Sequence, residues 1–188
     1  MKPIDEILEF NKKFIADKQY EEFLTNSKPN KKMVLLSCMD TRLTELLLKA
    51  MNLKNGDVKL IKNAGASIMH PFGSVMRSII IAIYQFEAKD IIVIGHHGCG
   101  MNNLNSQAIL DQAISRGISP SIIKILSSAG VDLRRWLKGF SSVEDSVKQS
   151  VAMIKEHPLM PKDVFVHGMI IDPVTGKLDY ILDASTLN

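Results

Sequence analysis

The chain has 188 residues, of which 46% are hydrophobic and 23% are charged, and its formal net charge is +3. This balance is typical of a globular protein and excludes a disordered or fibrous chain. The longest wholly apolar stretch, at 79–84, is far too short to cross a bilayer, and the N-terminus lacks the layout of a secretory signal. We therefore expect a cytoplasmic protein with no membrane partner. Because the positive charges are scattered, we also expect no nucleic-acid partner.

The first part of the chain predicts helices followed by a strand-and-helix alternation. Hydrophobic residues at roughly helical spacing predict one or two amphipathic helices over 3–24, which serve either as a simple cover helix or as an arm packing on a partner subunit. Short apolar runs then predict strands that are covered on both faces, at 33–37, 58–62 and 90–95. Helical patterns lie between these strands, at 41–52 and 74–86.

The second part is less regular until its end. Four helices are predicted there, at 107–115, 120–128, 131–138 and 143–155. A strand at 164–171, a turn at 172–176 and a last strand at 177–182 follow, with the two strands antiparallel.

This alternation predicts an α/β fold with a mostly parallel sheet of about four strands and an antiparallel C-terminal edge strand. Right-handed crossovers place helices on both faces of such a sheet. Because no linker or repeat interrupts the chain, we expect one domain over 1–188, with a helical arm at 1–30 and an α/β core at 31–188.

Two of the predicted strands end in side chains that can bind a metal. Cys38 follows the strand at 33–37, while His96, His97 and Cys99 follow the strand at 90–95. If these strands are neighbours, their carboxyl ends form a crevice at a topological switch point. Two thiolates and one imidazole are a ligand set of catalytic zinc with one position left open. The spacing does not choose between the two histidines, and two free buried thiols are the alternative.

The residues beside Cys38 suggest a second set of functional groups. Asp40 is placed to bind the metal or to accept a hydrogen bond from metal-bound water, and Arg42 can hold that carboxylate in a bidentate pair. The alternative is that Asp40 caps the following helix and Arg42 lies on the surface. The small residues at 63–66 can let backbone N–H groups approach a ligand, can form a tight turn, or can do both.

The pattern Cys38-x-Asp40-x-Arg42 followed by His96-x-x-Cys99 resembles the β-class carbonic anhydrases, in particular their compact bacterial and archaeal branch. Similarity extends over nearly the whole chain from about residue 30, through segments at 62–66, 76–79 and 168–178. The resemblance implies a Zn²⁺ cofactor held by the two cysteines and His96, with Asp40 and Arg42 as a catalytic dyad.

The same resemblance implies an enzyme that reversibly hydrates carbon dioxide to bicarbonate and a proton by means of a metal-bound hydroxide. It also implies a homodimer or a dimer of dimers, with the N-terminal arm wrapped around a neighbouring subunit. One departure is Lys54, which stands where the longer plant-like branch carries a glutamine. The alternatives are a COS or CS₂ hydrolase on the same scaffold, and a non-catalytic protein that binds zinc or bicarbonate.

Overall fold

The computed structural model describes residues 2–182, and its strands form one mixed five-stranded sheet of order β2-β1-β3-β4-β5. Neighbouring strands are parallel, except that β5 runs antiparallel to β4 at the edge. The predicted fold class is therefore confirmed. The strands are β1 (Met33–Cys38), β2 (Val58–Asn63), β3 (Asp90–His96), β4 (Phe165–Ile171) and β5 (Leu178–Leu182).

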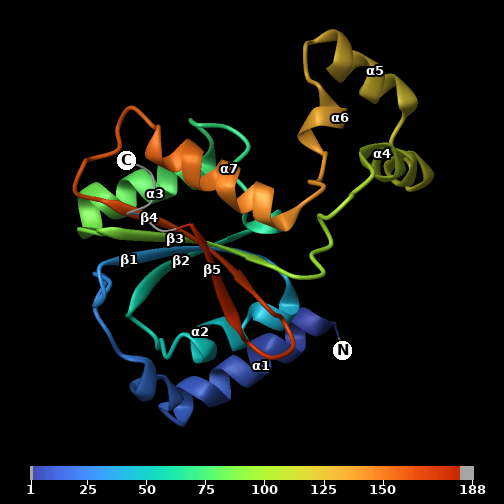
Figure 1. The fold of residues 1–188 in the computed structure, drawn as a ribbon. Coiled ribbons are helices and arrows are strands. Elements are labelled where there is room, and N and C mark those ends of the chain that lie inside the picture. The colour runs from blue at the N-terminus through green and yellow to red at the C-terminus, as the bar shows by residue number, and fades with distance from the viewer. Residues whose placement is uncertain (1, 183–188) are drawn as a thin grey trace.

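Helices cover both faces of this sheet (Figure 1). On one face, α3 (Ser74–Phe86) and α7 (Val143–Lys155) pack on Val34 and Leu36 of β1. On the other face, α2 (Leu46–Ala50) packs on Leu35, which points the opposite way because side chains alternate along a strand. Both sides of β1 and β3 are thus buried, which is why these strands are almost continuous apolar runs.

The two strands that carry the predicted metal ligands are neighbours. β1 pairs with β3 in parallel, with Met33 opposite Asp90 and Ser37 opposite Ile94. β2 follows β1 in the chain but lies on its other side, so the chain reverses its direction across the sheet at the β1–β3 boundary. The carboxyl ends of β1 and β3 therefore form the predicted crevice.

One helix prediction was wrong in its extent. The continuous helix expected over 41–52 is broken into a short 3-10 turn, η2 (Thr41–Leu43), and the five-residue α2. The Asp40 carboxylate accepts a hydrogen bond from the backbone N–H of Arg42 at 2.9 Å, which tightens the first turn. The periodic apolar residues predicted the burial of Leu43 and Leu47 correctly, but their spacing continues across the break and could not show it.

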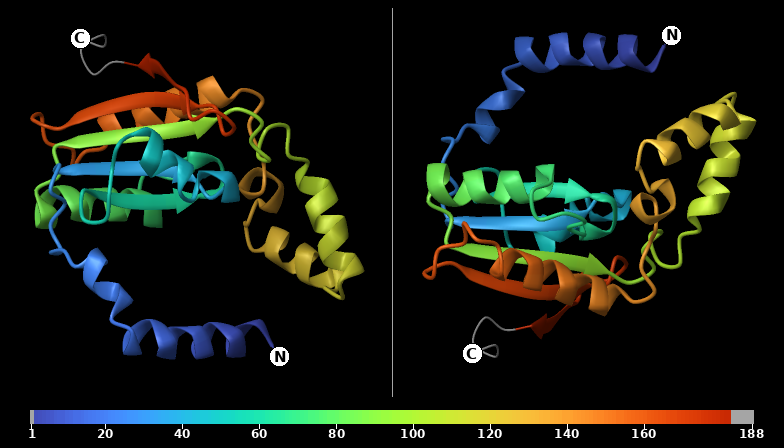
Figure 2. Two further views of the ribbon diagram at one scale, coloured as in Figure 1. Left: turned by 90° about the horizontal axis from the view of Figure 1, so that it is seen from below. Right: turned by 90° about the horizontal axis from the view of Figure 1, so that it is seen from above.

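The N-terminal segment stands apart from the sheet (Figure 2). It comprises α1 (Pro3–Ala16) and the 3-10 helix η1 (Gln19–Phe23), and none of their residues is buried. The base is fixed to the core, since Asn55 Nδ2 donates to the Phe23 carbonyl and Lys59 Nζ to the Ser27 carbonyl, each at 2.6 Å. Hence α1 is not a cover helix of its own core. In the part of the chain that is described, we find no helix long and apolar enough to span a membrane.

A second projection leaves the sheet beyond the carboxyl end of β3 (Figures 1 and 2). We call residues 104–139 the helical excursion; it holds α4 (Ser106–Ser115), α5 (Pro120–Ser128) and α6 (Leu133–Trp136). Its two ends meet in a neck, where Asn103 N donates to Phe140 O at 2.7 Å and Phe140 N donates to Met101 O at 3.1 Å. Helices in this segment were predicted, but the neck was not.

Gly139 permits the close approach of the two sides of the neck. A Cβ at this position would lie 2.0 Å from the Met101 carbonyl oxygen and 2.7 Å from Leu104 Cβ. We expect Gly139→Ala to lower the free energy of unfolding by about 2 kcal/mol or more, which is about 4–8 °C in Tm for a chain of this size. Gly100→Ala is the control, because a Cβ there meets nothing within 4 Å. Thermal unfolding followed by circular dichroism tests this, and equal Tm values for both variants would contradict it.

Candidate metal centre

Three of the predicted ligands converge at the carboxyl ends of β1 and β3. Cys38 is the last residue of β1 and His96 is the last residue of β3. Gly98, at φ +62°, adopts the left-handed conformation that turns the chain back and brings Cys99 beside Cys38. One ligand atom from each of the three residues lies within 4.8 Å of the other two, and all three residues are buried. Residues about sixty positions apart therefore form one group, as the sequence predicted.

The hydrogen bonding of His96 shows which ring nitrogen can bind a cation. Its Nδ1 lies 2.9 Å from the carbonyl oxygen of His97, which can only accept, so Nδ1 carries the proton. In the neutral ring Nε2 then keeps its lone pair. This Nε2 is buried and has no hydrogen-bond partner among the described residues. A buried acceptor without a partner is costly, and a metal ion is the partner that fits it.

The two sulfur atoms also have the spacing that zinc requires. Their separation is 3.8 Å, and two thiolates at a Zn–S distance of about 2.3 Å in a tetrahedral site lie about 3.8 Å apart. In the protein without metal, burial raises the pKa of the Cys99 thiol to about 11. Zinc must therefore displace a proton from this sulfur when it binds.

Asp40 and Arg42 form the predicted bidentate pair at the edge of the group. Arg42 Nε donates to Asp40 Oδ1 at 2.9 Å, and Arg42 Nη2 donates to Asp40 Oδ2 at 2.8 Å. This guanidinium holds the pKa of the Asp40 carboxyl well below its usual range, so the group stays ionised. The capping alternative is also realised, because Asp40 Oδ1 accepts from the Arg42 backbone as well.

The carboxylate of Asp40 faces the proposed ion position. Its Oδ2 lies 3.7 Å from His96 Nε2. His96 Nε2 and Asp40 Oδ2 can only accept hydrogen bonds, yet they face each other across a short gap. Beside them lie two sulfurs that become negative on deprotonation. Such a set favours a cation between its members. Arg42 Nη2 also donates to the Gly98 carbonyl at 3.3 Å, so this residue ties the Cys38 loop to the Cys99 loop.

The neck of the helical excursion forms a wall of the centre that the sequence did not predict. Met101 and Phe140 pack against the cluster that contains Cys38 and Cys99. Phe140 lies far from both motifs in the sequence, so no spacing argument linked it to them.

The small residues at 63–66 form the tight turn that was one of the two interpretations. The side chain of Asn63 closes this turn, because its Nδ2 donates to the Ser67 carbonyl oxygen and its Oδ1 accepts from the Ser67 backbone N–H. Their role toward a ligand stays a prediction.

His97 is exposed and does not join the three-residue group. Its contributions to the centre come from the backbone, since its N–H donates to Ile171 O at 3.2 Å and its carbonyl accepts from His96. We therefore expect His97→Ala to keep its zinc and to retain kcat/KM within about threefold. Metal analysis beside His96→Ala tests this. Loss of metal from His97→Ala with retention in His96→Ala would reverse the assignment.

Comparison with known proteins agrees with this geometry. The family model described as carbonic anhydrase matches residues 33–178. Two proteins of Bacillus subtilis (strain 168), YvdA and YtiB, carry provisional carbonic anhydrase names and are 55% and 54% identical over 183 residues. These matches cover 97% of this chain and 93% and 98% of the two proteins.

Among solved structures, the β-carbonic anhydrase TvaCA1 of Trichomonas vaginalis superposes with a TM-score of 0.89 at 31% identity, covering 98% of this chain and 100% of that one. A more distant relative is the carbon disulfide hydrolase of Acidianus sp. (strain A1-3), which is 27% identical over 79% of this chain and 76% of that protein. The family match, the two relatives above 50% identity and the shared fold together show that this chain belongs to the β-class carbonic anhydrases.

Proposed function

We propose that the protein catalyses the reversible hydration of carbon dioxide to bicarbonate and a proton, with Zn²⁺ held by Cys38, His96 and Cys99. The observation that carries this proposal is the convergence of two sulfurs and the free His96 Nε2 beside an ionised carboxylate. The carbonic anhydrase names of relatives above 50% identity support it.

The ligand set indicates what a bound ion supplies. Zinc with three protein ligands and an open position is a Lewis acid that makes a water molecule nucleophilic near neutral pH. Among the described residues the group that can hold a metal has three members, and Asp40 is engaged by Arg42. This arrangement favours a catalytic site over a structural zinc site closed by four protein ligands.

Residues of the chain position the attacking water and shield the metal ligands from solvent. Because Arg42 keeps the Asp40 carboxylate ionised, Oδ2 can accept a hydrogen bond from the attacking water. Such a bond would orient the water for attack on the carbon of the substrate. The buried apolar cluster around the cysteines, which includes Leu43, Leu47 and Ile171, keeps bulk solvent away from the ligands.

Stopped-flow measurement of CO₂ hydration, on protein whose zinc content has been determined, tests the activity. We expect turnover in proportion to bound zinc. The same preparation should be offered COS and CS₂, because relatives at 27% identity are named carbon disulfide hydrolases. Faster turnover of CS₂ or COS than of CO₂ would assign the chain to that alternative, and zinc-loaded protein inactive on all three would indicate a binding role.

We also propose a homodimer, or a dimer of dimers, in which the arm at 1–30 packs on a neighbouring subunit and 31–188 form the core. The support is the exposed α1, whose hydrophobic residues remain open to solvent in the single chain. Sedimentation equilibrium of the zinc-loaded protein measures the assembly, and a monomer at micromolar concentration would contradict this part of the proposal.

A further inference from the structure

An aspartate, a histidine and a tyrosine form a hydrogen-bonded chain outside the metal centre. Asp90 is the first residue of β3, whereas the metal ligand His96 is its last. His167 lies in β4, and Tyr180 lies in β5 at the edge of the sheet. His167 Nδ1 lies 2.5 Å from the hydroxyl oxygen of Tyr180, and His167 Nε2 lies 3.2 Å from Asp90 Oδ1. We call Asp90, His167 and Tyr180 the edge triad.

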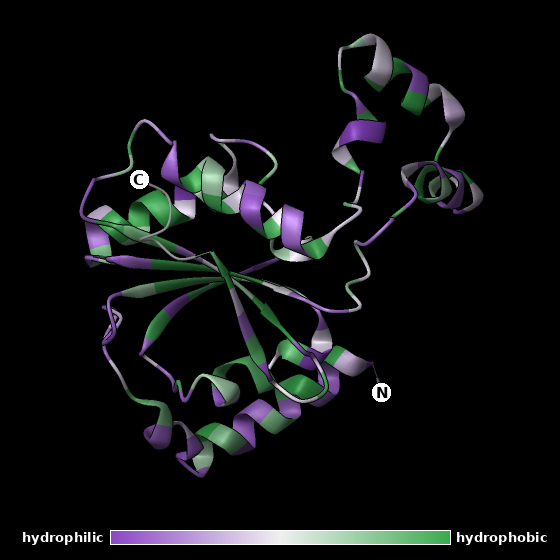
Figure 3. Cartoon of the chain, in the orientation of Figure 1, coloured by the Kyte–Doolittle hydropathy of each residue, from purple (hydrophilic) through white to green (hydrophobic). Residues whose placement is uncertain are grey.

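The strand register brings these three side chains to one face of the sheet. Asp90 pairs with Phe165 across the β3–β4 ladder, and His167 lies two residues farther along β4. Because side chains alternate along a strand, all three point to the same face. Tyr180 pairs with Met169 in the antiparallel β4–β5 ladder, which places it on that face as well. Figure 3 shows that β5 carries hydrophilic as well as hydrophobic residues, as expected of an edge strand that is open to solvent.

The carboxylate determines which ring nitrogen of His167 carries the proton. Asp90 Oδ1 can only accept a hydrogen bond, so His167 Nε2 is the protonated donor. In the neutral ring Nδ1 is then an acceptor, and the Tyr180 hydroxyl donates to it. An imidazole that is oriented by a carboxylate and bonded to a hydroxyl has the arrangement of a general base beside a nucleophile.

The hydroxyl-bearing residue is open to solvent while the base is shielded. Tyr180 is 48% exposed, whereas 19% of the His167 side chain is exposed. Phe165 is 53% exposed and stands on the same face of the sheet, opposite Asp90. An exposed phenyl ring on the face of the nucleophile offers apolar contact to a hydrocarbon chain or an aromatic ring. The surface around the edge triad therefore favours a substrate with an apolar group.

We propose that Tyr180 is a nucleophile that accepts an acyl group from an ester or thioester with an apolar acyl chain. As the phenol oxygen attacks the carbonyl carbon, its proton passes to His167 Nδ1, and Asp90 stabilises the imidazolium that forms. The new O–C bond replaces the bond to the leaving alcohol or thiol, which takes the proton back from the ring. This activity is separate from the hydration of CO₂, because the edge triad and the metal centre share no residue.

Release of 4-nitrophenol from 4-nitrophenyl butyrate, followed by peptide mapping, tests acyl transfer on the zinc-loaded protein. We expect a burst of about one equivalent per chain, with the butyryl group on Tyr180. Tyr180→Phe should abolish the burst and leave zinc content and CO₂ hydration unchanged. Hydrolysis of the ester at the metal centre would appear as a steady rate that this variant retains.

A second tyrosine provides the matched control for exposure. Tyr84 is 62% exposed, and its hydroxyl donates to the Leu159 carbonyl at 3.0 Å instead of to a histidine. If exposure alone governed reactivity, this residue would react at least as fast as Tyr180. We expect it to stay unmodified during the burst, and equal rates at the two tyrosines would overturn the proposal.

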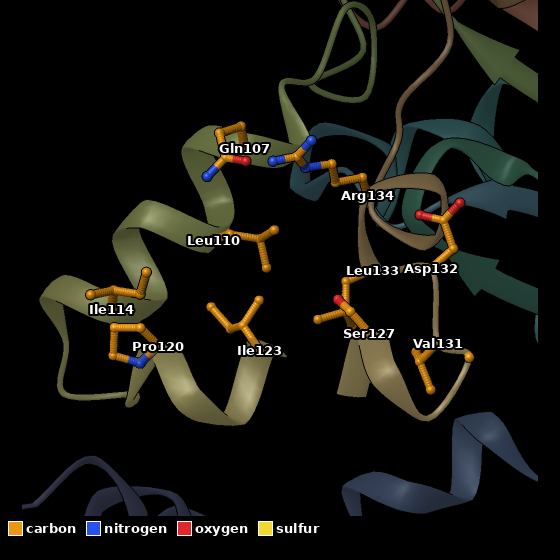
Figure 4. A pocket seen from close by; sticks show the side chains of 11 residues that line it. Gln107, Leu110, Ile114, Pro120, Ile123, Ser127, Val131, Asp132, Leu133 and Arg134 are labelled. Atoms are coloured by element: carbon orange, nitrogen blue, oxygen red, sulfur yellow. The ribbon is translucent and has the colours of Figure 1, made fainter. Parts of the chain in front are cut away.

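An aromatic ester can also enter the apolar groove of the helical excursion. Its cavity of about 500 Å³ lies between α4, α5 and α6, and Figure 4 shows Leu110 and Ile123 facing its centre. Ser127 lines this groove, but no histidine is found among the described residues around it. Butyrylation of Ser127 in place of Tyr180 would therefore mean that apolar contact alone governs the reaction, and it would overturn the proposal.

Variants of the base and of the carboxylate separate chemistry from packing. We expect His167→Gln to slow the burst at least about 100-fold and Asp90→Asn at least about tenfold, with unchanged far-ultraviolet circular dichroism. Imidazole added to the solution should restore the burst of His167→Ala, and Asp90→Glu should react faster than Asp90→Asn. A purely structural role would produce neither rescue.

The outcomes separate this inference from the proposed function. A parent protein without a burst, a burst that His167→Gln does not slow, or a failure of imidazole to rescue His167→Ala would each overturn the role of the edge triad. CO₂ hydration measured on the same zinc-loaded sample is judged independently, since Tyr180→Phe leaves the metal ligands untouched.

Discussion

Cys99→Ser is expected to release zinc and to abolish activity. The side chain keeps its size, but an alcohol does not ionise at neutral pH and is a poor ligand for zinc in comparison with a thiolate. Two protein ligands then remain of the three that converge in the structure. We expect the affinity for zinc to fall at least about 100-fold. Competition against a chromophoric zinc chelator, together with metal analysis after dialysis, measures this loss.

His96→Ala should cause a loss of the same order, because it removes the one buried nitrogen that has no other partner among the described residues. His97→Ala serves as the matched control on the adjacent residue. If Cys99→Ser retained stoichiometric zinc at the parent affinity, the assignment of the metal centre would be wrong, whatever the activity of the variant.

The affinity for zinc should also fall as the pH falls. Burial raises the pKa of the Cys99 thiol in the metal-free protein, so protons compete with the ion throughout the neutral range. Each step toward acid favours the protonated, metal-free form. Zinc uptake by the apoprotein near pH 7 should accordingly release protons into a weakly buffered solution, which a pH indicator or calorimetry in two buffers can detect.

Much of the fold followed from burial patterns in the sequence. β1 and β3 were predictable because each is apolar on both faces, and α7 was predictable because Val143, Val147 and Val151 repeat at helical spacing. The break between η2 and α2 was not, since the apolar residues keep helical spacing across it. The neck was not predictable either, because a contact between 101–104 and 139–140 leaves no periodic trace in the sequence.

The convergence of the proposed metal ligands had a topological basis in the sequence. Cys38 and His96 end two apolar strands, and the structure confirms the condition on which the prediction depended, that these strands are neighbours. Spacing left the choice between His96 and His97 open and the resemblance pointed to His96, while the structure adds which ring nitrogen of His96 is free, because Nδ1 faces a carbonyl oxygen. The role of Phe140 as a wall also needed them, as it depends on packing across the neck.

Asp40→Asn is expected to keep zinc and lose turnover. The amide is isosteric with the carboxylate, and Asp40 is not one of the three converging ligands. However, asparagine carries no charge and has one oxygen where the carboxylate has two, so its bidentate pair with Arg42 is lost. An amide NH₂ group facing the ion position would also donate a hydrogen bond, whereas the attacking water needs an acceptor there. We expect kcat/KM to fall about 100-fold or more, which corresponds to about 2.7 kcal/mol of transition-state stabilisation.

The loss of activity at acid pH tests whether Arg42 keeps the Asp40 carboxylate ionised. Arg42 lowers the pKa of Asp40, so the carboxylate loses its charge only as the pH falls through that depressed value. The parent enzyme should therefore show no loss from protonation of Asp40 between about pH 5 and 8. Arg42→Met removes the guanidinium, lets the pKa of Asp40 rise toward its ordinary value and should shift the acid loss to higher pH. A steep loss below neutral pH in the parent, with its zinc retained, would mean instead that Asp40 leaves Arg42 during acidification.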